Sequence, residues 1–266
     1  MSAPETFQIP LEQAEMYEAK FVPALFADWA PHVVEMGDVS PGHSVLDAAC
    51  GTGIVARTAS QRVGPDGRVV GVDLNPAMLT VAEQVCPGVE LRQADIASLP
   101  FDDATFDVAL CQMAVMFFAD RTAAIREMGR VVKPHGTVVV MVPSSLDAQP
   151  AYRPLVELAA RHAGPDAVAM LSAYWACGDL DDLLRTTRDA GLEALSTRTR
   201  MGTARFDSID EFISVEVEGT PVRERLTDDE YAALRREATR VLHEFVAADG
   251  TAQIPIEGHL VAARHG

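Results

Sequence analysis

Three acidic side chains stand where predicted strands end. Asp47 closes a short apolar strand, Asp73 ends the next predicted strand, and Asp95 follows the third. Because open α/β sheets bind ligands at the carboxyl ends of their parallel strands, we expect these carboxylates to lie along one edge. Ionised carboxylates accept hydrogen bonds and attract cations. The three positions therefore predict a site for a nucleoside that also carries a cationic amino group.

A glycine-rich loop follows Asp47 and opens the next helix. The residues Gly51-Thr52-Gly53-Ile54-Val55-Ala56 fit the pattern G-x-G-x-x-A of dinucleotide-binding enzymes, so an NAD-dependent oxidoreductase is the rival interpretation. Asp47 counts against this rival, because a carboxylate beside the loop repels a pyrophosphate. Asp73 can accept hydrogen bonds from both ribose hydroxyls, and the pair Asp95-Ile96 suits an adenine ring and its exocyclic amine.

Alternating strand and helix patterns must position these residues. The pattern predicts strands over 44–49, 68–73, 89–93, 106–111 and 137–142, and helices over 51–63, 76–86 and 121–132. Repeated β-α units of this length indicate a parallel sheet with helices on both faces. Before and after this core we expect helices over 11–37, 179–190, 209–218 and 227–248, and strands over 193–201 and 253–264.

In this arrangement the chain resembles the class I S-adenosylmethionine-dependent methyltransferases of the small-molecule type, which include the ubiquinone/menaquinone-biosynthesis methyltransferases. The resemblance covers roughly residues 44–142, with the motifs in the family's order. The motifs are Val45-Leu46-Asp47-Ala48-Ala49-Cys50-Gly51-Thr52-Gly53, Val70-Gly71-Val72-Asp73-Leu74-Asn75-Pro76-Ala77-Met78-Leu79, Ala94-Asp95-Ile96-Ala97-Ser98-Leu99-Pro100-Phe101, Phe106-Asp107-Val108-Ala109-Leu110-Cys111 and Arg126-Glu127-Met128-Gly129-Arg130-Val131-Val132-Lys133-Pro134-His135-Gly136.

The resemblance implies which residues contact the cofactor S-adenosyl-L-methionine. Gly51 and Gly53 would flank its methionine part, with Asp47 near the amino end, and Ala49 stands where many members have a glycine. The remaining contacts that it implies are Asp73 on the ribose, Leu74 and Met78 near the adenosine, Asp95 and Ile96 on the adenine, Cys111 and Gln112 through backbone groups, and Phe117 and Tyr17 in the wall.

The fold that the resemblance implies is a Rossmann-like, doubly wound, seven-stranded α/β sheet with an antiparallel last strand and a helical cap. We expect one domain over 1–266, with an N-terminal helical lid (1–40), a cofactor-binding core (41–143) and cap insertions (144–175 and 206–250). The cap contains aromatic residues that favour an apolar or planar small-molecule acceptor. These residues are Tyr152, Tyr174, Trp175 and Phe212.

No catalytic residue is assigned from the sequence. A methyl group on a sulfonium is already activated, so the protein mainly aligns the nucleophile and excludes water. His32 and His243, on the predicted lid and cap helices, are the histidines that we consider for an acceptor pocket. A member of the same fold that binds the cofactor without methylating anything is a further alternative, beside the NAD-dependent enzyme.

The composition and charge of the chain restrict which partners, metals and cellular locations we expect for it. The net charge of -17 disfavours nucleic acid and anionic membranes. Cys50, Cys86, Cys111 and Cys177 show no C-x-x-C or zinc spacing, so no metal is expected. The N-terminal stretch has no basic segment followed by an apolar run, and no apolar stretch is long enough to span a bilayer, so we expect a cytoplasmic protein without membrane insertion. For the assembly of the protein, the candidate that we consider is a homodimer.

Overall fold

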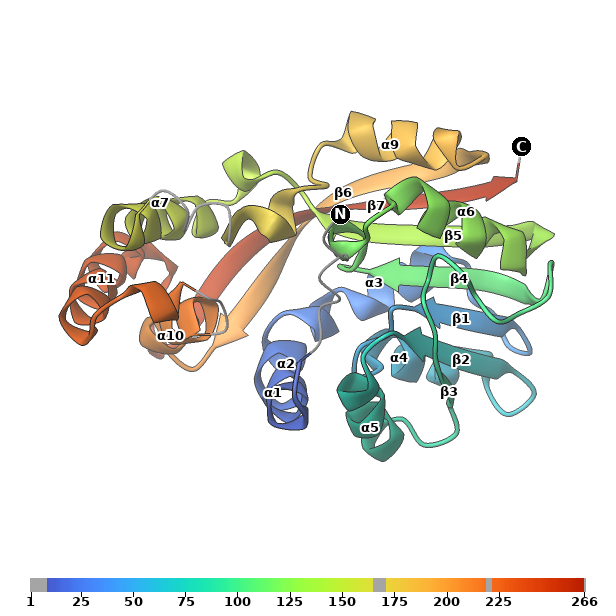
Figure 1. The fold of residues 1–266 in the computed structure, drawn as a ribbon, viewed down its shortest axis with the longest axis horizontal. Helices are drawn as coiled ribbons and strands as arrows, with labels where there is room; N and C mark the ends of the chain where they lie inside the picture. Colours follow the sequence, from blue (N-terminus) through green and yellow to red (C-terminus); the bar gives the residue numbers. More distant parts are fainter. Residues whose placement is uncertain (1–8, 165–170, 219–221, 266) are drawn as a thin grey trace, which may run out of the picture.

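The computed structural model describes residues 9–164, 171–218 and 222–265, and its centre is a seven-stranded sheet in the order β3-β2-β1-β4-β5-β7-β6. Strands β1 to β5 are parallel, and β7 is antiparallel to both of its neighbours, β5 and β6 (Figure 1). The strands are β1 (Ser44–Ala48), β2 (Arg68–Asp73), β3 (Glu90–Gln93), β4 (Phe106–Gln112), β5 (Val132–Pro143), β6 (Leu192–Phe206) and β7 (Ala252–His265). The predicted doubly wound fold with an antiparallel last strand is confirmed.

Helices cover both faces of the parallel strands. The central strands β1 and β4 are mostly apolar and are buried along almost their whole length, which is the pattern of strands covered on two sides. One face packs against α3 (Ala30–Met36) and α4 (Ile54–Val63). The other face packs against α6 (Arg121–Val131) and α9 (Leu180–Asp189). Helix α5 (Pro76–Val85) lies beside β2 and β3.

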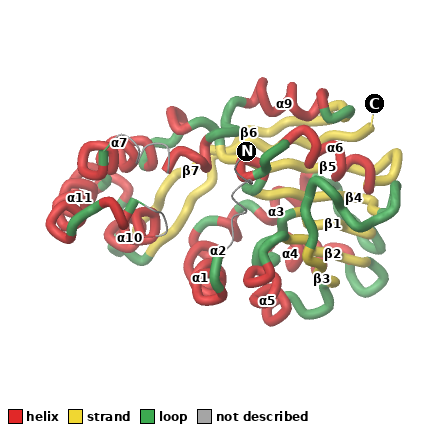
Figure 2. Tube along the Cα trace, in the orientation of Figure 1, coloured by secondary structure: helices red, strands yellow, loops and turns green. Residues whose placement is uncertain are grey.

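Strands β6 and β7 extend beyond the parallel sheet as a two-stranded arm. The pairing of β7 with β5 ends at Gly258, opposite Pro143, whereas its pairing with β6 continues to Ala252, opposite Phe206. Figure 2 shows this yellow two-stranded arm running into a lobe of helices. The helices of this lobe are α7 (Tyr152–Ala163), α10 (Ile209–Glu218) and α11 (Asp228–Val241). The lobe therefore sits at the carboxyl-end side of the sheet, joined to it by the arm and by the loops after β5.

Short helices at the N-terminus bridge the sheet and the lobe. They are α1 (Leu11–Met16), a π-helical turn (Tyr17–Phe21), α2 (Val22–Ala24) and a 3₁₀ turn (Phe26–Asp28). Ala14 packs with Met78 and Val81 of α5. Glu18 forms an ion pair with Arg57 of α4 at 2.8 Å, and Lys20 pairs with Glu211 of α10 at 2.7 Å.

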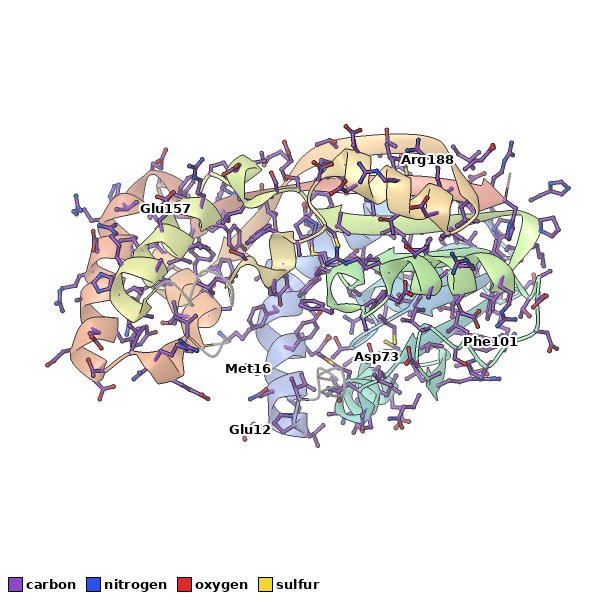
Figure 3. All side chains as sticks on the ribbon, turned by 45° about the horizontal axis from the view of Figure 1, so that its top comes forward. Glu12, Met16, Asp73, Phe101, Glu157 and Arg188 are labelled. Carbon is purple, nitrogen blue, oxygen red and sulfur yellow. The ribbon has the colours of Figure 1, made fainter. Side chains whose placement is uncertain are left out.

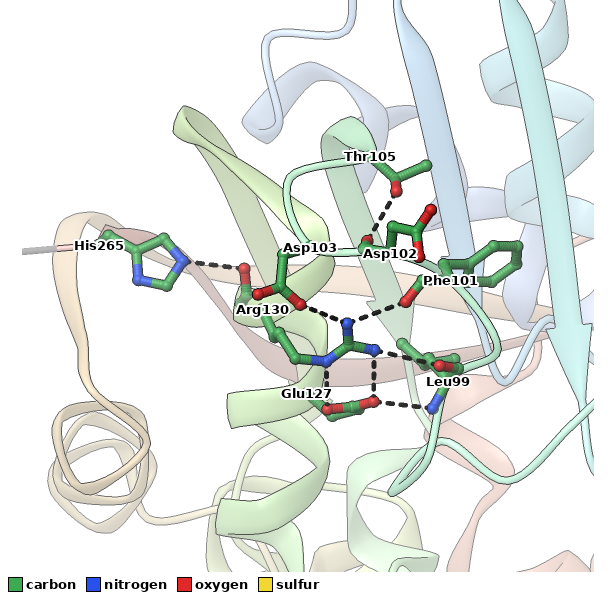
Figure 4. Close-up of polar contacts among 9 residues, drawn as sticks. Leu99, Phe101, Asp102, Asp103, Thr105, Glu127, Arg130 and His265 are labelled. Carbon is green, nitrogen blue, oxygen red and sulfur yellow. Dashed lines mark hydrogen bonds and ion pairs between the residues drawn. The ribbon is translucent and has the colours of Figure 1, made fainter.

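The loop between β3 and β4 is held on α6 by one arginine. Arg130 donates to the carbonyls of Leu99 and Phe101 and to the carboxylates of Asp103 and Glu127, while Glu127 accepts the N–H of Leu99 (Figure 4). Charge-assisted hydrogen bonds of this kind are stronger than neutral ones. Arg130 and Glu127, which lie in a predicted motif, thus order the segment that begins at Asp95.

The elements match the expected ones in type and order, and they differ at several of their ends. The strand expected at 137–142 begins at Val132, and the one expected at 193–201 runs over Leu192–Phe206. The helix expected over 227–248 ends at Val241 and is followed by a 3₁₀ turn. Parts of the predicted lid (1–8) and cap (165–170 and 219–221) lie outside the described residues. Within the described part of the chain, no helix has the length and apolar character needed to cross a bilayer.

Candidate functional site

A cleft of about 340 Å³ opens at the carboxyl ends of the parallel strands. Residues from the ends of β1, β2 and β4 and from the loops after β3 and β4 line it, and Tyr17 and Phe26 of the N-terminal helices close one side. Eleven of the thirteen residues that the sequence predicts for the cofactor site lie in its wall. These are Tyr17, Asp47, Ala49, Gly51, Asp73, Leu74, Met78, Asp95, Ile96, Gln112 and Phe117.

The cleft is acidic. Its wall contains Asp47, Asp73, Asp95 and Asp120, and none of the described residues that line it is lysine, arginine or histidine. A pyrophosphate would face carboxylates without a counter-charge, whereas a cationic ligand would gain from them. This arrangement counts against a dinucleotide.

Asp73 organises the loops on either side of it. Its two carboxylate oxygens accept the backbone N–H groups of Gly51, at 2.8 Å, and Asn75, at 2.9 Å. Burial raises the pKa of Asp73, and these backbone hydrogen bonds lower it in part. A carboxylate has about four lone-pair sites, so Asp73 can also accept hydrogen bonds from a ligand's two hydroxyls. Figure 3 labels Asp73, together with Glu12 and Met16 of α1.

Asp47 caps the helix that follows the glycine loop. Gly53, at the N-cap position of α4, offers no side chain, and the Asp47 carboxylate accepts the N–H of Ala56 at 2.8 Å. Negative charge is favourable at this end of a helix. Asp47 is 1% exposed, and its burial raises its pKa to about 7. It combines a structural role with a position in the cleft wall.

The loop after β1 has an unusual backbone conformation. Ala49, Gly51 and Gly53 all have positive φ angles, of 58°, 55° and 89°. Glycine adopts this region freely, and a residue with a Cβ pays about 1–2 kcal/mol. The alanine at the position where the resemblance suggests glycine is therefore strained. The Tyr17 ring lies 3.8 Å from the point where a Cβ of residue 51 would be, which is an ordinary contact distance, so the glycine is favoured there by its backbone angle.

The far end of the cleft is a mostly apolar slot beside Asp95. Met78 and Ile96 are buried, and Leu74 is 38% exposed at its mouth. Asp95 is exposed and accepts the N–H of Ala97 at 2.8 Å, which forms a local turn. A flat heteroaromatic ring with an exocyclic amine would fit between these groups.

The near end contains aromatic rings and an amide. Phe117 meets Tyr174 edge-on, with ring centroids 5.3 Å apart, and Tyr17 packs against Phe26 at 5.1 Å. Gln112 donates from Nε2 to the carbonyl of Phe26 at 3.0 Å. Its Oε1 is buried and has no hydrogen-bond partner among the described residues. A ligand N–H group would satisfy that oxygen.

Two predicted site residues do not reach the cleft wall. Gly53 is buried beneath the loop, where a Cβ would lie 2.3 Å from the Cys86 sulfur. Cys111 is fully buried on the face that packs against α6, because alternate residues of β4 point to opposite sides. Neither His32 nor His243 is among the described residues that line this cleft.

Several wall residues were not predicted. Asn75 caps α5 by accepting the N–H of Ala77, and Asp120 caps α6 by accepting that of Ala123, so a capping pattern could have indicated both. Met113, which follows β4 with a φ of 52°, had no sequence signal.

The buried carboxyl of Asp47 predicts a pH effect on stability. Its pKa is about 7 in the folded protein and near 3.8 when unfolded, so its contribution is complete below pH 4 and is lost as the pH rises through 7. We expect Asp47→Asn to flatten the fall in the free energy of unfolding between about pH 4 and 7. Urea titrations across this range would measure it.

Asp95→Asn is the matched control, because it changes an exposed carboxyl of the same cleft. If the free energy of unfolding depends on pH in the same way in the wild type and in Asp47→Asn, the Asp47 carboxyl does not cause the fall in stability. Part of the wild-type slope should survive in Asp47→Asn, since burial also raises the pKa of Asp73.

Known proteins share this architecture and its central motifs. The family model described as "Methyltransferase domain" matches residues 46–140. A ubiquinone/menaquinone biosynthesis C-methyltransferase from Idiomarina loihiensis is 39% identical over 119 residues, covering 42% of this chain and 47% of that protein. A demethylmenaquinone methyltransferase from Bacillus cereus is 34% identical over 118 residues, covering 42% and 50%. The chain spans about half the length of these curated relatives.

Solved structures extend the likeness beyond the core. A structure described as a putative methyltransferase from Bacillus halodurans has a TM-score of 0.59 and 20% identity, covering 88% of this chain and 97% of that one. A phosphoethanolamine N-methyltransferase from Haemonchus contortus has a TM-score of 0.58 and 18% identity, covering 96% and 57%. At these identities the likeness establishes the fold. The likeness to a methyltransferase domain lies in residues 46–140, within a fold that these solved structures share.

Proposed function

We propose that this protein transfers a methyl group from S-adenosylmethionine to a small-molecule acceptor. The observation that carries the proposal is the cleft at the strand ends, whose described wall has four aspartates and no basic residue. Such a wall suits a ligand with a sulfonium and an ammonium group and disfavours the pyrophosphate of NAD. The cleft volume of about 340 Å³ lies within the range of small-molecule sites.

The residues present fit this cofactor. Asp73 would hold the ribose hydroxyls, and Asp95 with Ile96 would hold the adenine, beside Leu74 and Met78. Asp47 and the unsatisfied oxygen of Gln112 suit the amino end of the methionine part. The backbone around Ala49 and Gly51 would border the same part, and Cys111 would contribute only through its backbone. Gly53 is assigned to shaping the loop.

The chain's own part in the reaction is alignment and exclusion of water. When bound, S-adenosylmethionine supplies an activated methyl group on sulfur. Tyr17 and Phe117 would cover the near end of the cleft and limit the entry of water. A nucleophile held in line with the methyl–sulfur bond gains from proximity, and acidic carbons, thiols and amines need no dedicated base.

We further propose a division of labour along the chain. Residues 1–40 would act as a lid, 41–143 as the cofactor-binding core, and 144–175 with 206–250 as a cap that selects the acceptor. The relatives named for quinone biosynthesis support a small, largely apolar acceptor. A cytoplasmic location and a homodimer stay proposals from the sequence, to be tested by cell fractionation and light scattering.

Calorimetry with S-adenosylhomocysteine tests the cofactor assignment. We expect saturable binding at one site per chain, and protection against thermal unfolding by S-adenosylhomocysteine but not by NADH. Protection by NADH alone would replace the proposal with an oxidoreductase. Cofactor binding without methyl transfer to any of a panel of quinols, phenols, amines and thiols would instead indicate a member that does not methylate.

A further inference from the structure

A second, smaller chamber lies beside the cofactor cleft. Its volume is about 30 Å³, and it shares Met113 and Tyr174 with the cleft wall. Phe21 and Leu25 of the N-terminal helices, and Ile256 of the β6–β7 arm, form other parts of its lining. The chamber therefore lies where the lid, the sheet and the helical lobe meet, next to the end of the cleft that contains Phe117.

The lining of this chamber is apolar with one exception. Among the described residues that line it, Glu216 of α10 is the only ionisable group apart from two tyrosines, Tyr152 and Tyr174. A carboxylate in such surroundings is costly unless a partner compensates it.

Glu216 is held in place by an aromatic cluster. The Tyr152 hydroxyl donates to its Oε1 at 3.3 Å, and the Tyr152 ring packs edge-on against Trp175, at 4.9 Å, and Phe212, at 5.3 Å. Burial raises the pKa of Glu216 to about 7, with the Tyr152 hydrogen bond acting in the opposite direction. The side chain is therefore a positioned hydrogen-bonding group in a poorly solvated chamber.

The indole of Trp175 provides a second, independent polar feature. Trp175 also lines the chamber, and its Nε1 is buried with no hydrogen-bond partner among the described residues. Buried donors are nearly always satisfied in folded proteins. A polar group entering from the cleft would meet the Glu216 carboxylate in a wall that also contains this buried donor.

We infer that Glu216, positioned by Tyr152, binds a hydrogen-bond-donating group at one end of an otherwise apolar acceptor molecule. This inference rests on the proposed function, because it assigns the chamber to the acceptor beside the cofactor cleft. The donating group is a hydroxyl or an amine. The volume of the chamber matches a small polar group or a water rather than a whole ring, so the body of the acceptor lies towards Tyr174 and the cleft.

Matched aromatic probes test this inference. 2-Naphthol and 2-methylnaphthalene have nearly the same shape and differ in one hydroxyl, and 2-naphthylmethylamine presents an ammonium group instead. Binding of each is measured by calorimetry in the presence of saturating S-adenosylhomocysteine, for the wild type, Glu216→Gln and Glu216→Leu. We expect the wild type to prefer a hydroxyl or ammonium probe to 2-methylnaphthalene by tenfold or more, and Glu216→Leu to abolish this preference. Glu216→Gln keeps an acceptor oxygen and should retain the preference for 2-naphthol in part.

Glu157→Leu is the matched control, because it removes a glutamate of α7 that is 62% exposed (Figure 3). It should bind every probe as the wild type does. Affinity for S-adenosylhomocysteine and the thermal unfolding midpoint are recorded for each variant, so a folding defect is recognised separately. The inference is overturned if the wild type binds 2-methylnaphthalene as tightly as the hydroxyl and ammonium probes. It is also overturned if Glu216→Leu keeps the preference for the polar probes. Absent binding of S-adenosylhomocysteine to the wild type overturns the proposed function instead, and the probes are then compared without it.

Discussion

Asp73→Ala should weaken the binding of S-adenosylhomocysteine by about 100-fold or more, because a hydrogen bond to a charged group is worth about 1.5–3 kcal/mol and two ribose hydroxyls would lose theirs. The variant also releases the N–H groups of Gly51 and Asn75, which Asp73 holds in the wild type. Asp73→Asn keeps one acceptor oxygen and a similar volume, and should therefore fall between the wild type and the alanine variant. Calorimetric titration gives the three dissociation constants.

Asp95→Ala is the control that shows whether the loss of affinity is specific to Asp73. Asp95 lies in the same cleft wall but is exposed, so its hydrogen bond competes with water and its loss should cost tenfold or less. Circular dichroism would confirm that each variant is folded. Equal affinities for the wild type and Asp73→Ala would remove Asp73 from the cofactor site.

Gly53→Ala should lower the free energy of unfolding by about 2–5 kcal/mol, because it adds a left-handed backbone penalty to overpacking. The backbone angle φ is 89° at Gly53, and the new Cβ would lie 2.3 Å from the Cys86 sulfur. Cys86 is itself buried, so its sulfur has little room to move away from the added methyl group. Urea unfolding followed by circular dichroism measures the loss.

Two further variants separate the backbone contribution to this loss of stability from the steric contribution. Gly42 has a similar φ of 81° with no atom within 4 Å of its Cβ position, so Gly42→Ala should show the backbone cost alone. Adding Cys86→Ala to Gly53→Ala removes the clashing sulfur and should recover the steric part. A Gly53→Ala protein no less stable than Gly42→Ala would show that the contact with Cys86 is unimportant.

The sequence predicts the cofactor core well because the relevant patterns are local. Each acidic residue lies at or just after the end of its own strand, and regular β-α repeats bring successive strand ends to one edge. Asp47, Asp73 and Asp95 therefore line one cleft in the structure, as expected. Capping adds a second local pattern, since Asn75 and Asp120 each begin a helix at the same edge.

Features that depend on tertiary packing were missed or misassigned. Gly53 belongs to the predicted motif, yet its neighbour is Cys86, which is distant in sequence. Cys111 is expected to act through its backbone, and the packing of β4 turns its side chain away from the cleft. The prediction of β6 stopped at Met201, although burial alternates along the residues that follow it, up to Phe206. Glu216 has no local pattern, and only the packing of α10 against Tyr152 brings it to the chamber.

The two-stranded arm formed by β6 and β7 has a consequence for how such a protein diverges. Its outer part pairs only with itself, so the helices inserted between Phe206 and Ala252 can change in sequence and length without altering the register of β1 to β5. Similarity to the curated relatives is confined to about 119 residues, which fits such independent change. A chimera that exchanges residues 207–251 for the equivalent segment of another member should keep its donor affinity and acquire a different acceptor range.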